Sequence, residues 1–289
     1  LDFTFGFHPN FSLIFAEHGQ QVIGVDIDGE RVSTINKGIM PFLEHGSEPR
    51  LKKHINKAVR VTSDAEEAVK KCDAIIFTLG TPVDEHVNPI FKQIEQALIN
   101  IIPHLREGQL LILRSTVSPG TTEYIKRFIE KRTRFRIGHD FFLAFCPERI
   151  AEGFSIEELR EIPQIIGALD KESAARAEAV FRTFNDNVMH SDARSAELAK
   201  IFTNMYRYIN FAIANEFMMI ADAHDRNIYE IIDLVNKGYK RGGLKQPGLT
   251  AGPCLFKDGF FLINKIPYTE LIAIGWKLNE SVPAYLIEK

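Results

Sequence analysis

The 289-residue sequence is poor in cysteine, in long apolar runs and in net charge. Its three cysteines, Cys72, Cys146 and Cys254, are widely spaced; they form no metal-ligand pair, and their odd number argues against a disulfide framework. Few, widely spaced cysteines without a disulfide framework are typical of proteins in a reducing cytoplasm. No run approaches the length of a membrane span, and no basic-then-apolar signal opens the chain. The net charge of −3 implies no general affinity for nucleic acid or anionic membranes.

The chain also lacks the glycine-rich turn that a dinucleotide-binding fold places between its first strand and first helix. Residues 1–10 contain one glycine, Gly6, with phenylalanine and histidine where further glycines are expected. Side chains at these positions crowd a pyrophosphate, and few residues precede Gly6 to form a first strand. Two interpretations follow: the amino-terminal segment is truncated, or the cofactor site is damaged.

What is present is a regular alternation of apolar runs and helical patterns. The apolar runs lie at 22–26, 73–79, 110–115, 142–146 and 164–167. The helical patterns lie at about 10–19, 29–38, 64–70, 89–102, 121–131 and 171–184. This alternation predicts an α/β domain with a doubly wound, Rossmann-like parallel sheet covered on both faces. We place this domain at residues 1–190, with an incomplete first strand.

The periodicity changes near residue 190. From Asp192 to about residue 225, apolar residues recur at steps of three and four, which predicts one long helix with Asp192 as its N-cap. A Gly/Pro-rich loop follows at 238–252. Further helices are expected at about 228–237, 258–262 and 267–288. We therefore expect residues 191–289 to form a smaller all-helical domain around one long core helix.

Polar residues follow three predicted strands at their carboxyl ends, where parallel sheets bind ligands. Asp26 suits the ribose hydroxyls of NAD, and an acid there repels the 2′-phosphate of NADP. The alternative is an aspartate that only caps the next helix. Segments 80–84 and 114–122 carry hydroxyl groups and glycines that suit a nucleotide or a sugar, but plain turns and helix caps use the same residues.

The residues around Cys254 are typical of a nucleophile. Gly252 and Pro253 form a turn before the thiol, and Lys257 and Asp258 follow three and four positions later. A cysteine held in this way can attack a carbonyl carbon, while a nearby Asp or Lys manages the proton of a water. The alternative is a small buried hydrophobe after a turn.

A second polar pair lies on the predicted long helix. Lys200 and Asn204 are four residues apart, so they share one helix face. A lysine ammonium in a cleft could stabilise an alkoxide formed during hydride transfer, and Asn204 could hold the same oxygen or an ordered water. The alternative is a solvated helix face.

Taken in their order along the chain, these motifs resemble those of the UDP-glucose/GDP-mannose dehydrogenase family of nucleotide-sugar dehydrogenases. The resemblance covers nearly the whole chain. The most specific segments are 146–153 (CPERIAEG), 196–200 (AELAK) and 251–258 (AGPCLFKD). Arg149 and the Gly-Pro-Cys sequence are most similar to the UDP-N-acetyl-D-mannosamine dehydrogenases. Family members continue into a third domain that binds the nucleotide sugar, so the resemblance implies that this chain lacks that domain.

The resemblance implies oxidation of the C6 alcohol of a UDP-sugar to a carboxylate in two NAD-dependent steps. Cys254 would trap the C6 aldehyde as a thiohemiacetal, and the second oxidation would leave a thioester that water cleaves. Lys200 and Asn204 would support the oxyanion.

The remaining implied roles concern protons and the cofactor. Asp258 and Glu148 would handle water and protons, and Thr116 would hold a water or the nicotinamide side. The implied catalytic residues are Cys254, Lys200, Asn204, Asp258, Glu148 and Thr116. The implied NAD-binding residues are Gly6, Asp26, Arg31, Thr81, Pro82, Ser115, Thr116 and Glu148.

The family pairs its long helix with a twin, so the resemblance implies a homodimer with a UDP-sugar as substrate. The cysteine spacing, the net charge and the lack of a long apolar run predict no metal, nucleic acid or membrane as partner. Two other functions stay open. One is a truncated, non-catalytic oligomerising remnant whose cofactor pocket is blocked by Phe5 and His8. The other is a β-hydroxyacid dehydrogenase, which uses a helix Lys and Asn for a single oxidation; it needs no thiol, so Cys254 with Asp258 speaks against it.

Overall fold

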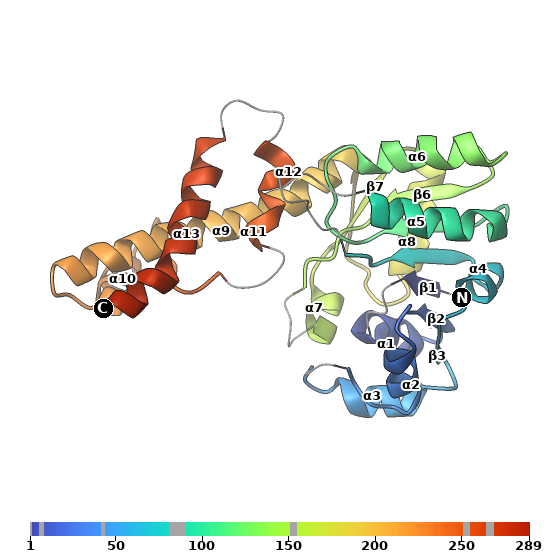
Figure 1. Ribbon diagram of the computed structural model, residues 1–289, viewed down its shortest axis with the longest axis horizontal. Coiled ribbons are helices and arrows are strands. Elements are labelled where there is room, and N and C mark those ends of the chain that lie inside the picture. Colours follow the sequence, from blue (N-terminus) through green and yellow to red (C-terminus); the bar gives the residue numbers. More distant parts are fainter. Residues whose placement is uncertain are drawn as a thin grey trace. The chain divides into compact units, whose positions relative to one another are not determined.

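The structure is a computed structural model that describes residues 2–5, 9–41, 44–80, 91–150, 155–250, 255–263 and 269–289. Within these residues the chain divides into two compact units (Figure 1). The first unit is an α/β domain that ends at Lys200, and the second is helical and begins at Ile201.

The described residues of the first unit form an eight-stranded sheet with the order β3-β2-β1-β4-β5-β6-β7-β8. Its strands are β1 (Asp2–Phe5), β2 (Val22–Val25), β3 (Val59–Thr62), β4 (Ala74–Phe77), β5 (Leu110–Leu113), β6 (Phe142–Phe145), β7 (Gln164–Ala168) and β8 (Val188–Asp192). Strands β1 to β6 are parallel. The order reverses between β1 and β4, and open parallel sheets bind ligands at such a switch point, beyond the carboxyl ends of the strands.

Two features of the sheet differ from the sequence prediction. Strand β1 pairs over all four of its residues with both β2 and β4, so it is as long as its neighbours. Strand β7 pairs antiparallel with β6, so the expected parallel sheet reverses at that point. Strand β7 begins near the edge where β5 and β6 end, since Gln164 at its start accepts a hydrogen bond from Arg114, which follows β5 (3.3 Å).

Helices cover both faces of the sheet, because successive strand residues point to opposite faces. Ile76 and Ile112 pack in a core with α1 (Pro9–Glu17), α3 (Ser47–His54), α7 (Ser155–Glu161) and α8 (Lys171–Phe181). Ile75 and Leu111 pack on the other face with α4 (Ala65–Lys71), α5 (Lys92–Ile101) and α6 (Thr121–Arg132). The remaining helices of this unit are α2 (Gly29–Asn36) and the 3-10 turn η1 (Ile102–His104).

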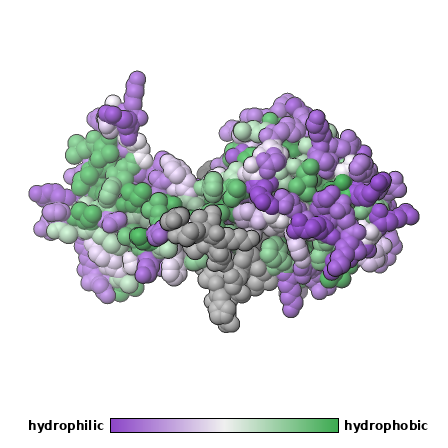
Figure 2. Space-filling view, turned by 90° about the horizontal axis from the view of Figure 1, so that it is seen from above, coloured by the Kyte–Doolittle hydropathy of each residue, from purple (hydrophilic) through white to green (hydrophobic). Residues whose placement is uncertain are grey.

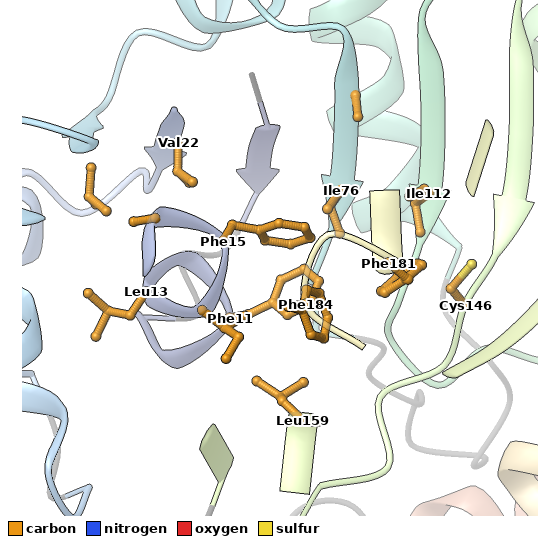
Figure 3. Packing of buried hydrophobic residues seen from close by; sticks show 14 of the residues in the cluster. Phe11, Leu13, Phe15, Val22, Ile76, Ile112, Cys146, Leu159, Phe181 and Phe184 are labelled. Atoms are coloured by element: carbon orange, nitrogen blue, oxygen red, sulfur yellow. The ribbon is translucent and has the colours of Figure 1, made fainter. Parts of the chain in front are cut away.

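Helix α1 packs two phenylalanines of its own, Phe11 and Phe15, on the side where Phe181 and Phe184 lie (Figure 3). Phe11 and Phe15 both meet the ring of Phe184 edge-on, with centroids 6.2 and 5.1 Å apart, and Phe181 completes the group. Every residue from Pro9 to Ala16 is buried, so the helix has no solvated face. Such a cluster fixes the first turn of α1 just beyond the carboxyl end of β1.

The second unit is organised along one long helix, α9 (Ala193–Ala223), as the sequence predicts. The Asp192 carboxylate accepts the Ser195 N–H (2.9 Å), which confirms the expected N-cap. The other helices are α10 (Ile228–Asn236), α11 (Leu255–Asp258), α12 (Phe260–Ile263) and α13 (Glu270–Glu288). A small core joins α9 to α12 and α13, and it contains Ile201, Met205, Tyr208 and Phe261 with Ile272 and Trp276 at its margin. In the part of the chain that the structure describes, no helix combines the length and apolar character needed to cross a membrane.

Candidate active site

The carboxyl end of β2 carries a buried acid. Asp26 is 6% exposed, and its two oxygens accept the Asp28 N–H (3.0 Å) and the Arg31 guanidinium (3.1 Å). The cap of α2 is Asp28, whose carboxylate accepts the N–H groups of Glu30 and Arg31. Asp26 is therefore not the helix cap that the sequence left as an alternative. Asp26 and Arg31, both predicted to bind the cofactor, are brought together at this edge.

The carboxyl ends of β5 and β6 carry an ion pair. Arg114 donates to the Glu148 carboxylate from Nε (2.9 Å) and from Nη2 (2.6 Å), and the Glu148 N–H donates back to the Arg114 carbonyl (3.0 Å). The second oxygen of Glu148 accepts the N–H groups of Arg149 (2.8 Å) and Ile150 (3.2 Å). Both oxygens of this predicted catalytic carboxylate are thus held by donors.

Arg114 is 2% exposed, although its guanidinium is charged. The group lies over the rings of Phe11 (4.3 Å) and Phe181 (5.1 Å) and donates to the Cys146 carbonyl (3.2 Å). Burial raises the pKa of the Cys146 thiol to about 12, and the charge of Arg114 opposes this only in part. Cys146 is therefore an inert core thiol, and the charge of Arg114 is compensated by Glu148.

Between β5 and α6 lies the turn with Ser115 and Thr116, both half-buried and both predicted to bind the cofactor. The turn ends at Gly120, whose backbone is left-handed (φ 94°). The N–H of Gly120 donates to a carboxylate of α9, that of Glu197 (2.6 Å). The long helix is thus tied to the edge of the sheet that carries the predicted cofactor residues.

In the second unit, two predicted catalytic residues meet. Asn204 of α9 donates its side-chain N–H to the Asp258 carboxylate of α11 (2.6 Å), and both side chains are buried. Asp258 lies four residues after Cys254 in the sequence. Lys200 is half-buried one helical turn before Asn204.

An amide network holds the segment that precedes Cys254. The side chain of Asn215 on α9 pairs with both backbone groups of Gly248: it accepts the N–H (2.9 Å) and donates to the carbonyl (3.0 Å). It also donates to Asn279 of α13 (2.9 Å), which in turn donates to the Tyr208 carbonyl (3.1 Å). This loop is therefore anchored to α9 and α13 at Gly248.

Four of the predicted site residues, Gly6, Thr81, Pro82 and Cys254, lie outside the described residues. Within the described ranges no group of His, Cys, Asp and Glu side chains could hold a metal ion. Sequence reasoning gave no role to Arg114 or Glu197. The available signals were an arginine directly after the apolar run Leu110–Leu113 and a glutamate three residues before Lys200, on the helix face that also carries Asn204.

Comparison with known proteins identifies the family. Residues 10–185 match the NAD binding domain of the UDP-glucose/GDP-mannose dehydrogenase family, and residues 194–280 match its central domain. The chain belongs to this family. The two matched regions correspond closely to the α/β unit and the helical unit.

Related proteins agree with this assignment. The UDP-N-acetyl-D-mannosamine dehydrogenase of Pyrococcus horikoshii is 33% identical over 95% of this chain and 66% of the relative. A solved UDP-D-ManNAc dehydrogenase from the same species is similar over 100% of this chain and 70% of that one, with a TM-score of 0.93 and 32% identity. The Staphylococcus aureus UDP-N-acetyl-mannosamine dehydrogenase Cap5O gives a TM-score of 0.86 and 30% identity, over 100% of this chain and 69% of that one. This chain spans 64–66% of the length of the first curated relatives.

Proposed function

We propose that the protein is an NAD-dependent nucleotide-sugar 6-dehydrogenase that oxidises the C6 alcohol of a UDP-sugar, such as UDP-N-acetylmannosamine, to the uronate. The family assignment supports the reaction class. The observation that carries the proposal is the buried hydrogen bond between Asn204 and Asp258 (2.6 Å). It joins the helical turn of Asn204 on α9 to α11, whose first residue, Leu255, follows Cys254 in the sequence.

The residues at the switch point fit NAD. Asp26 offers buried carboxylate oxygens of the kind that bind ribose hydroxyls, beside the cationic Arg31. In the first turn of α1, the Asn10 side-chain nitrogen and the Ser12 hydroxyl are buried and find no hydrogen-bond partner among the residues that the structure describes, so this turn holds polar groups that a phosphate could satisfy. NAD supplies the acceptor for the hydride in each oxidation.

The side chains of this protein supply the remaining chemistry. The Cys254 sulfur bonds to the aldehyde carbon, and the resulting oxyanion is stabilised by Lys200 and Asn204. Loss of a hydride from that carbon leaves a thioester. Attack by water breaks the carbon–sulfur bond, which releases the carboxylate and restores the thiol, and Asp258 takes the proton of the water. Glu148, whose carboxylate is held by Arg114 and by the N–H groups of Arg149 and Ile150, is the second carboxylate assigned to water and protons.

A cavity of about 330 Å³ in the second unit suits the nucleotide part of the substrate. Two cations, Arg207 and Lys245, and two aromatic rings, Tyr206 and Phe211, are among the residues that line it. Cations bind a diphosphate and aromatic rings stack on a base. Arg207 lies three residues after Asn204 on α9, so the cavity begins within one turn of the Asn204–Asp258 pair.

The mechanism is tested with Cys254→Ser. We expect this variant to form no uronate from UDP-N-acetylmannosamine and at most one NADH per sugar, because the first oxidation needs no thiol, whereas Cys72→Ala, which alters a buried thiol of the first unit, keeps the activity. Unchanged turnover in Cys254→Ser would contradict the proposed role of Cys254.

Two further measurements separate the alternatives. Two NADH formed per UDP-sugar consumed support the proposal, whereas one supports a single-step dehydrogenase of the β-hydroxyacid type. Calorimetry with NAD addresses the remnant: absent or only millimolar binding would show that the chain is no dehydrogenase.

We also propose that the protein forms a homodimer through α9. Ile213, Phe217 and Ile220 are 40–49% exposed along one side of this helix. Phe217 and Ile220 border an apolar groove of about 500 Å³ that continues onto α10 at Val235. Hydrophobic residues gather on the surface of the helical unit, whereas hydrophilic ones dominate the sheet unit (Figure 2). A second copy of the same helix would cover this face by two-fold symmetry.

Sedimentation velocity tests the dimer. Phe217→Glu should weaken dimerisation by about 30-fold or more, because it places a charge in an apolar interface. Ile99→Glu, at an exposed apolar position of α5, should have no effect. A wild-type protein that sediments as a monomer would refute the interface.

A further inference from the structure

The first turn of α6 receives its cap from a distant helix. A helix leaves its first N–H groups without an intrahelical partner, and Gly120 at the cap position has no side chain to offer. Glu197 of α9 fills this position. Its Oε2 accepts the Gly120 N–H (2.6 Å), and its Oε1 accepts the N–H (2.8 Å) and the hydroxyl (2.6 Å) of Thr122.

This carboxylate is almost completely removed from solvent. Glu197 is 1% exposed; burial raises its pKa, while the bonds from Thr122 and Gly120 lower it. A buried carboxylate is costly unless its oxygens are satisfied, and here three donors and the positive end of α6 satisfy them. The Glu197 carboxylate and the backbone of Gly120 and Thr122 therefore hold each other in place.

The cap closes one end of the turn that carries Ser115 and Thr116. The other end is closed by Arg114, which is buried and ion-paired with Glu148. Ser115 and Thr116 therefore lie between two buried charged side chains. Loss of either one frees an end of the turn.

The same contact fixes the start of α9. Ala196, next to Glu197, packs against Gly167 of β7 so closely that a methyl group added at Gly167 would lie 2.4 Å from its Cβ. Arg194 pairs with Glu123 on the first turn of α6 (2.6 Å). Lys200 follows Glu197 by three residues, so its helical turn is anchored to the sheet by the buried contacts of Glu197 and Ala196, whereas the Arg194–Glu123 pair is exposed and does not position it.

We infer that Glu197 is a positioning residue: its carboxylate, bound to Gly120 and Thr122, holds the Ser115–Thr116 turn and the Lys200 turn of α9 in one fixed relation. Glu197 itself touches no reactant. This inference rests on the proposed function, in which Lys200 supports the oxyanion, and on the predicted cofactor role of Ser115 and Thr116. A displacement of about 1 Å in such groups costs about 10²-fold in rate.

The test compares Glu197→Gln with Glu123→Gln in the full chain. The glutamine keeps the shape but turns one acceptor oxygen into an N–H₂ group that faces a donor. The control removes the exposed ion pair between the same two helices and leaves the cap intact. Steady-state kinetics with NAD and UDP-N-acetylmannosamine are measured together with hydrogen exchange of the Gly120 and Thr122 amides.

We expect Glu197→Gln to lower kcat by about 10²-fold with little change in the KM of the UDP-sugar, and to speed exchange at both amides. Glu123→Gln should change neither. If Glu197→Gln does not fold, Thr122→Val, which removes one of the three donors, should give a smaller loss of kcat in the same direction.

The two possible failures are distinguishable. A wild-type chain without turnover contradicts the proposed function. A wild-type chain that turns over, with Glu197→Gln matching it in kcat or in amide exchange, overturns the positioning role. A loss confined to KM, with kcat preserved, also overturns it.

Discussion

The two units of the molecule bury polar groups in different ways. The sheet unit buries charges: Arg114 with Glu148, and Glu197 against the start of α6. The helical unit relies mainly on amides, since Asn204, Asn215 and Asn279 are buried there and the acid among them, Asp258, accepts from one of these amides. The units also differ in their cores, since two large clusters cover the sheet, whereas α9 leaves apolar side chains exposed.

The difference follows from the backbone groups that each architecture leaves available. Turns at the edge of a parallel sheet expose N–H groups and helix N-termini, which can bind a buried carboxylate. Helices use almost all of their own backbone groups internally, so side chains that both donate and accept must join them to loops. Asn215, which binds both the N–H and the carbonyl of Gly248, is such a side chain.

The largest effect is expected from breaking the ion pair of the sheet unit. Glu148→Ala leaves the guanidinium of Arg114 buried without its counter-charge, so the free energy of unfolding should fall by about 3–5 kcal/mol. Urea unfolding followed by circular dichroism measures this loss. Glu66→Ala, which removes an exposed pair with Lys70, should change stability by less than about 1 kcal/mol. Equal losses in the two variants would contradict the importance of burial.

A somewhat smaller effect is expected where α9 packs on the sheet. The Cβ of Gly167→Ala would lie 2.4 Å from the Ala196 Cβ and 3.0 Å from the Ala193 Cα, so stability should fall by about 3 kcal/mol. Gly29→Ala meets no atom within 4 Å and should be neutral or slightly stabilising. Thermal unfolding of both variants provides the measurement, and a neutral Gly167→Ala would show that α9 can shift on the sheet.

The amide network of the helical unit should contribute about 2 kcal/mol. Asn215→Ala leaves the Gly248 N–H and carbonyl without their partner, at a cost of this order. Trp276 of α13 is the chain's one tryptophan, so its fluorescence reports on this unit. Asn210→Ala, whose side chain bonds only to the Tyr206 carbonyl of its own helix among the described contacts, should leave the fluorescence transition in place.

The smallest effect concerns the N-cap of α9. Hydrogen bonds from Ser195 lower the pKa of Asp192 in the folded state, so this carboxylate adds stability above its unfolded pKa and loses it as the pH falls through the folded pKa. Asp192→Asn keeps the cap, so stability at neutral pH should stay within about 0.5 kcal/mol. Its acid-induced loss of stability should be smaller than that of the wild type, and an unchanged pH dependence would contradict the assignment.

Local patterns were enough to predict much of the fold. Apolar runs and three- to four-residue periodicity identified β2, β4 to β7 and the long helix, because these elements are buried on regular faces. Polar elements were missed. Strand β3 alternates buried with exposed residues, β8 is an edge strand exposed at most positions, and α3 and α7 are short and rich in charge.

By itself the sequence determined which residue types carry the proposed chemistry and in what order, because helical and strand periodicity and short motifs depend on neighbours along the chain. The tertiary structure alone decided which of them meet. Arg114 and Glu148 are 34 positions apart, Asn204 and Asp258 are 54 apart, and Glu197 caps a helix 75 positions away. A buried charge or amide is stabilised only by a polar group that tertiary packing brings next to it. The separation of two residues in the sequence does not predict whether packing brings them together.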